Sequence, residues 1–111
     1  MAKYETVVEG KFEEVVKQLQ LDISNSGISM NLVDESNFTV GGTKVAVRVY
    51  DKYYMRNGNR TSLSLTVAGN EDKIYITAIG AGGGSGVIFN FSLGAETDMV
   101  DIVQRSVERM G

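Results

Sequence analysis

The chain has 111 residues, of which 42% are hydrophobic and 23% charged, and its formal net charge is −3. This length and balance suit one globular domain over residues 1–111, and no apolar run approaches the roughly 18 residues of a membrane span. The absence of histidine and cysteine excludes disulfides, the usual zinc sites and histidine or thiolate catalysis. We therefore expect no metal and no other cofactor, and the missing reactive groups argue against an enzyme.

The charge and the N-terminus bear on partners and location. Nucleic-acid binders usually carry a net basic footprint, so a net charge of −3 disfavours nucleic acid as a partner. Residues 1–5 turn polar at once and lack the apolar core of a signal peptide. Together with the absence of cysteine, these features predict a cytoplasmic protein that does not contact a membrane.

The first expected elements are a short strand over residues 3–8 and an amphipathic helix. Apolar residues recur in that helix at helical spacing and predict one buried stripe. The stripe consists of Phe12, Val15, Val16, Leu19 and Ile23. Gly27 suits the left-handed residue that often ends a helix.

Residues 28–93 are expected to form strands, because apolar and polar residues alternate there with period two. Val45, Val47 and Val49 are the clearest example, and we place them on the buried face, with Arg48 and Tyr50 exposed. The other alternating apolar residues are Ile28, Met30, Leu32, Phe38, Val40, Leu63, Leu65, Val67, Ile74, Ile76, Ala78, Val87, Phe89, Phe91 and Leu93.

Two turns predict strand pairings that keep apolar side chains together. A two-residue Gly41-Gly42 loop would pair Phe38 with Val45. An Asn70-Glu71 loop would bring the apolar residues of the next two strands opposite each other in the same way. Both turns favour sequential antiparallel hairpins.

The turn near Asn57 admits two registers. A two-residue loop at residues 57–58 would pair Val49 with Thr66, which mixes the two faces. A three-residue loop at residues 57–59 would pair Val49 with Val67. Because a slip of one residue turns every side chain to the other face, we prefer the three-residue loop or a nearby bulge.

The last expected element is a second amphipathic helix. Its stripe consists of Met99, Ile102, Val103, Ser106, Val107 and Met110. The order β-α-β-β-β-β-β-α predicts a two-layer α+β fold, in which an antiparallel meander of five or six strands carries both helices on one face. The alternative is a more curved sheet that grips the C-terminal helix around a cavity for a small apolar ligand.

Several segments resemble a family of small uncharacterised bacterial proteins. The resemblance lies in residues 44–50, Met55 with residues 59–63, residues 77–79 with the glycine-rich segment after them, the phenylalanine-rich stretch, and residues 93–96. It covers nearly the whole chain. It implies a bacterial domain of unknown function and assigns no activity or site.

The glycine-rich segment 80–86 is one candidate site. Backbone N–H groups of such segments can hold phosphates, and the candidate residues here are Gly82, Gly83, Gly84, Ser85 and Gly86. The segment leads into an expected strand and no lysine follows it, so it lacks the context of a P-loop or dinucleotide site. A hairpin connection is the simpler interpretation. A loop that closes on a small ligand, in a binding domain or an enzyme, is the alternative.

The exposed sheet face is the second candidate site. The expected registers place aromatic, basic and hydroxyl side chains there, namely Arg48, Tyr50, Lys52, Tyr54, Thr66 and Tyr75. Such residues suit a homodimer or another protein partner, although a solvated strand face has the same composition. We therefore predict a non-enzymatic interaction module that self-associates, or binds a partner, through its exposed sheet face or edge.

Three polar residues fall at positions expected to be buried, namely Asp34, Ser36 and Asp51. An unpaired buried carboxylate is costly. Either a bulge turns these residues outward, or the sheet extends beyond its helices, or the three residues line a pocket that holds a cation.

Overall fold

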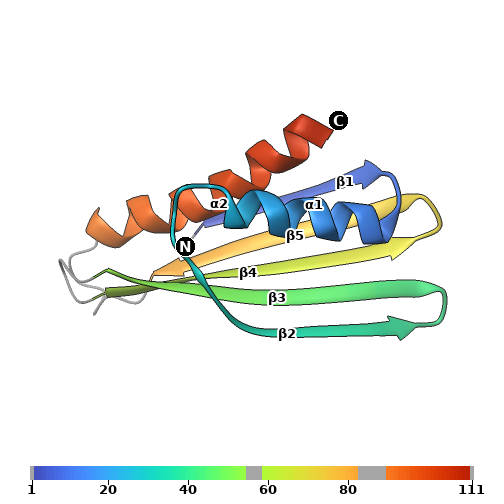
Figure 1. The fold of residues 1–111 in the computed structure, drawn as a ribbon, viewed down its shortest axis with the longest axis horizontal. Helices are drawn as coiled ribbons and strands as arrows, with labels where there is room; N and C mark the ends of the chain where they lie inside the picture. Colours follow the sequence, from blue (N-terminus) through green and yellow to red (C-terminus); the bar gives the residue numbers. More distant parts are fainter. Residues whose placement is uncertain (1, 55–58, 83–89, 111) are drawn as a thin grey trace.

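The computed structural model describes residues 2–54, 59–82 and 90–110. The elements in chain order are β1 (Ala2–Glu9), α1 (Phe12–Ser24), β2 (Asn31–Val40), β3 (Thr43–Tyr54), β4 (Asn59–Asn70), β5 (Lys73–Gly82) and α2 (Asn90–Met110). The strands form one five-stranded antiparallel sheet in the order β1-β5-β4-β3-β2. Both helices lie on one face of this sheet (Figure 1). The predicted two-layer α+β fold is confirmed.

The C-terminal helix is longer than the sequence pattern predicts. Residues 90–93, which we expected to end a final strand, form the first turn of α2. Residues 87–89 of that expected strand lie outside the described residues. The element order is therefore β-α-β-β-β-β-α, because a short apolar run does not by itself distinguish a strand from a helix.

The hairpin from β2 to β3 has the predicted register, with Phe38 opposite Val45. Gly41 in its turn has φ of 60°, a left-handed conformation that glycine adopts without strain. The next hairpin, β4 to β5, pairs Asn70 with Lys73, so its turn lies one residue later than expected. That shift moves every pair by two residues, and the faces of both strands are unchanged.

The hairpin from β3 to β4 does not have the register that we preferred, and this difference changes which residues of β3 face the helices. Val49 pairs with Ser64, and the strands meet at the ends of the 55–58 connection, so the three-residue loop is wrong. Ala46, Arg48 and Tyr50 are buried on the helix side. The valines of β3 point to the opposite face, contrary to our assignment, because the length of the connection determines which face each residue takes.

The core lies between the helices and strands β3, β4 and β5. The predicted helix stripes are confirmed, since Val15, Val16, Leu19 and Ile23 of α1 are buried, as are Met99, Ile102, Val103, Ser106 and Val107 of α2. From the sheet, the buried residues include Leu63, Leu65, Val67, Ile74, Ile76 and Ala78. In the described part of the chain, no helix is long and apolar enough to cross a membrane.

Candidate functional site

The face of the sheet turned away from both helices, here called the open face, has an uncharged centre. Its residues within 45–49 of β3, 62–68 of β4 and 75–81 of β5 are apolar or neutral polar. Charged open-face residues lie around this centre, for example Glu5 on β1 and Asp34 on β2. Protein interfaces have the same anatomy, with charge depleted at the core and concentrated at the rim.

One apolar row crosses all five strands of the open face. Its members follow one another as direct strand partners: Phe38, Val45, Ala68, Tyr75 and Val7. Phe38, Tyr75 and Val7 are about half exposed. A continuous exposed apolar row of this kind is typical of a surface that contacts another molecule.

The structure separates the residues that we expected on one exposed face. Thr66 and Tyr75 do lie on the open face. Arg48 and Tyr50 instead lie buried on the helix side, and Lys52 shares their strand alternation. Tyr54 also shares it by position, although its side chain is outside the described residues. The two groups therefore do not form one surface, and a role in partner binding stays a prediction for each group.

The glycine-rich candidate site lies almost wholly beyond what the structure describes. Gly82 ends β5, where Thr61 is its partner on β4. Gly83, Gly84, Ser85 and Gly86 fall outside the described residues. Phosphate or ligand binding by this segment stays a prediction.

The polar residues expected at buried positions are on the open face. Asp34 and Ser36 follow a register irregularity between Leu32 and Asp34 and are exposed. The carboxylate of Asp51 lies 3.6 Å from Nη1 of Arg60. A bulge accounts for part of this outcome and the reversed faces of β3 account for the rest. Among the described residues, no three carboxylates gather closely enough to hold a metal ion.

A groove runs along one side of α1, above β3 and β2. It consists of a cavity of about 440 Å³ near Phe12 and Lys17 and another of about 290 Å³ near Ile28. Gln20 and Ser24 of α1 line both cavities, so the two lie next to each other along α1. Sequence reasoning missed this groove, because it requires Arg48 and Tyr50 to face the helices.

Arg48 lies at the floor of the groove with its side chain 7% exposed. Its Nη1 donates hydrogen bonds to the carbonyl oxygens of Val47 at 3.0 Å and Ser36 at 3.3 Å. Its Nε lies 3.0 Å from Oε1 of Glu35 as an ion pair, but the N–H is not aligned for a hydrogen bond. Burial raises the pKa of nearby Tyr50, Arg48 opposes that shift, and Glu35 reinforces it. Tyr50 is therefore neutral at pH 7.

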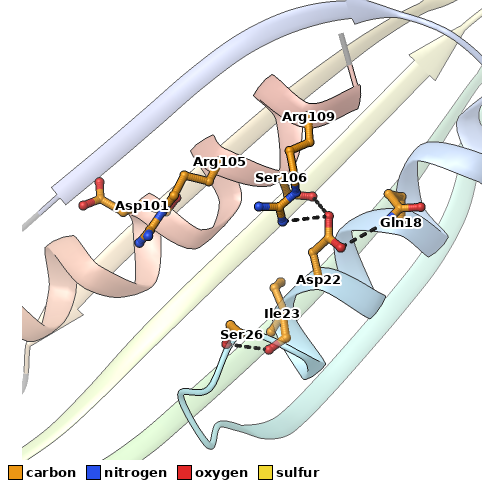
Figure 2. Close-up of polar contacts among 8 residues, drawn as sticks. All are labelled: Gln18, Asp22, Ile23, Ser26, Asp101, Arg105, Ser106 and Arg109. Atoms are coloured by element: carbon orange, nitrogen blue, oxygen red, sulfur yellow. Dashed lines mark hydrogen bonds and ion pairs between the residues drawn. The ribbon is translucent and has the colours of Figure 1, made fainter.

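A second polar cluster joins the two helices (Figure 2). Asp22 of α1 accepts hydrogen bonds from Oγ of Ser106 and, at 3.0 Å, from Nε2 of Gln18. Nη2 of Arg109 lies 3.4 Å from the same carboxylate. Burial alone would raise the pKa of Asp22, but these three partners lower it by more, so the carboxylate is ionised at neutral pH. The cluster fixes α1 against α2.

We expect Ser106→Ala to lower the free energy of unfolding by about 1–2 kcal/mol at pH 7, because it removes a hydrogen bond to an ionised, mostly buried acceptor. The pKa of Asp22 is lowered by folding, so its contribution is complete above the unfolded pKa near 4 and is lost as pH falls through the folded pKa. Urea titrations from pH 7 to pH 3 should therefore show the difference between wild type and variant shrinking in acid. A difference that is constant across this range would contradict the assignment.

The comparison with protein families identifies the family of this chain. The model of DUF6054, a family of unknown function, matches residues 1–111. The chain belongs to this family. The match confirms the resemblance to a family without known activity, and membership of DUF6054 assigns no site residue.

Other comparisons add little. Among curated proteins, none matches the chain significantly. A crystal structure of TTHA0849 from Thermus thermophilus is similar over 96% of this chain and 91% of its own, with 11% identity and a TM-score of 0.35. So low a TM-score supports no inference about this DUF6054 member.

Proposed function

We propose that this DUF6054 chain is a non-enzymatic interaction module that self-associates by packing the open faces of two copies together. The observation that carries the proposal is the uncharged centre of the open face, crossed by one apolar row and bordered by charged residues. Val45, Val47 and Val49 supply β-branched side chains at that centre, which pack well between two sheets. The absence of cysteine suits a cytoplasmic location, which with a bacterial origin is part of the proposal.

The size of the open face supports a stable pair. Five strands of about 10 residues, with a rise of ~3.3 Å per residue and a spacing of ~4.8 Å between strands, give a face of roughly 800 Å². A standard protein interface buries about 800 Å² on each partner. Packing that covers most of the open face would reach this value without any contribution from the helices.

The open face suits self-association better than the β2 edge does. β2 is exposed along all its residues, so its outer backbone groups could pair with another strand. However, Asp34 and Glu35 lie mid-strand beside the register irregularity, and bulges and charges are the devices that hinder edge pairing. We therefore place the contact on the face.

Val47→Lys tests the proposal, because Val47 lies at the centre of the open face, between Ser36 and Thr66. In a symmetric pair the new lysine would be buried close to its own copy, and we expect the dissociation constant of the dimer to rise at least about 100-fold. Sedimentation equilibrium over a range of protein concentrations measures this constant.

Leu21→Lys is the matched control, since it makes the same change of charge at an exposed apolar residue on the helix side. It should leave the dimer constant unchanged. A wild-type chain that is monomeric at about 1 mM would contradict self-association. A Val47→Lys variant that dimerises like wild type would show that another surface is used.

A further inference from the structure

We propose that the groove between α1 and strands β2 and β3 binds a small amphiphile with one carboxylate group. The carboxylate would lie at Lys17 and Arg48, and the apolar part would extend toward Ile28 and Leu32. This site is on the helix side of the sheet. It is therefore independent of the open face and of self-association.

On the helix side of the sheet, neither helix lies across the edge formed by β2 and β3 (Figure 1). α2 packs on β1, β4 and β5, and α1 packs on α2 and β4. Figure 1 shows β3 and β2 extending past α1 with neither helix lying across them. The cavities of about 440 Å³ and 290 Å³ occupy this space beside α1, and their sizes suit a small molecule.

The end of the groove near the α1–β2 connection is suited to an apolar tail. Its lining combines five apolar or aromatic residues, Ile23, Ile28, Met30, Leu32 and Tyr50, with the uncharged polar residues Gln20, Ser24 and Ser29. The residues that line this cavity carry no charge at pH 7, and Nζ of Lys52 donates a hydrogen bond to the carbonyl oxygen of one of them, Ser29, at 3.4 Å. Leu32 is 45% exposed, so it offers apolar surface that a ligand could cover.

The other end of the groove favours a single negative charge. Lys17 and Arg48 line it together with Glu13, which accepts a hydrogen bond from Nζ of Lys44 at 2.6 Å. The contacts of Arg48 described above use Nε and Nη1. A carboxylate brings one negative charge to Lys17 and Arg48, whereas a dianionic phosphate would meet the negative charges of Glu13 and Glu35 more strongly.

Decanoate, decanol and decyltrimethylammonium test the proposal, because they share a tail and differ in charge. Calorimetric titration should show decanoate binding at least about tenfold more tightly than decanol, and the cationic amphiphile binding more weakly than decanol. Heteronuclear NMR should show the decanoate-dependent shifts along α1 and at Leu32 and Tyr50.

Variants separate the two ends of the site. Lys17→Met, at an exposed position, and Arg48→Met should each weaken decanoate at least about fivefold and leave decanol unchanged. Arg48→Met should stay folded, since methionine keeps the unbranched apolar stem of arginine and Glu35 is half exposed, and circular dichroism checks this. Leu32→Asp should weaken both ligands. Phe38→Asn, on the open face of the same strand, is the matched control and should weaken neither.

Three results would overturn the proposal. Decanol could bind as tightly as decanoate, decanoate could bind more weakly than about 1 mM, or its NMR shifts could fall on the open face. If the NMR signals of groove residues shift with protein concentration in the absence of ligand, the groove instead binds a second copy of the chain. Loss of dimerisation in Val47→Lys with decanoate binding intact would show that failure of one site does not entail failure of the other.

Discussion

Leu65→Ala is expected to lower the free energy of unfolding by about 3–4 kcal/mol, which is a large part of the stability of a domain of this size. Leu65 is 1% exposed on β4, between Arg48 and Ala78 of the neighbouring strands. The substitution removes buried methyl groups and leaves a cavity that the surrounding sheet closes only in part. Urea denaturation followed by circular dichroism measures the effect.

Leu32→Ala is the matched control for that experiment, since it makes the same chemical change at a residue that is 45% exposed. We expect it to cost less than about 1 kcal/mol. Equal losses for Leu65→Ala and Leu32→Ala would contradict the placement of the core between the helices and β4.

Gly69→Val is expected to lower the free energy of unfolding by about 3 kcal/mol, despite the higher strand propensity of valine. A Cβ atom at Gly69 would lie 2.8 Å from Cδ1 and 3.1 Å from Cβ of Phe12, and 2.9 Å from Cδ1 of Ile74. Ile74 can move its terminal methyl group, but the Cβ of Phe12 is fixed to the start of α1. The variant therefore forces the helix away from β4.

Gly42→Val controls for the loss of backbone freedom, because a Cβ atom there would meet only Oδ1 of Asn70, at 3.9 Å. We expect its unfolding free energy to stay within about 1 kcal/mol of wild type. Combining Gly69→Val with Phe12→Ala should recover part of the loss caused by Gly69→Val, since the ring no longer obstructs the new side chain. Strictly additive losses in this double-mutant cycle would show that the ring of Phe12 is not the obstacle.

The two proposed sites depend on the same structural fact, which is the direction of the side chains of β3. Because Val47 faces away from the helices, the centre of the open face is uncharged and suited to a second copy. Because Arg48 and Tyr50 face the helices, the groove has a basic floor beside an apolar end. If the side chains of β3 pointed to the opposite faces of the sheet, neither surface would exist.

Sequence reasoning located part of these sites. It identified Thr66 and Tyr75 as residues of an exposed sheet face, and both lie on the open face. It also singled out Arg48 and Tyr50, but on the wrong side of the sheet. The link from Asp22 to Ser106 had only one signal in the sequence, a serine within the apolar stripe of the second helix.

The sequence by itself determined the apolar stripes of the two helices, the alternation within each strand and the two-layer fold, because these follow from periodicity over a few neighbouring residues. It also determined the pairing of Phe38 with Val45, since a two-residue glycine turn admits few geometries. Only the tertiary structure decided which face of β3 lies under the helices. In that strand both alternating sets contain apolar side chains, so local hydrophobicity does not separate them. The choice depends on the length of the 55–58 connection and on packing against α1 and α2, which are interactions between residues far apart in the chain.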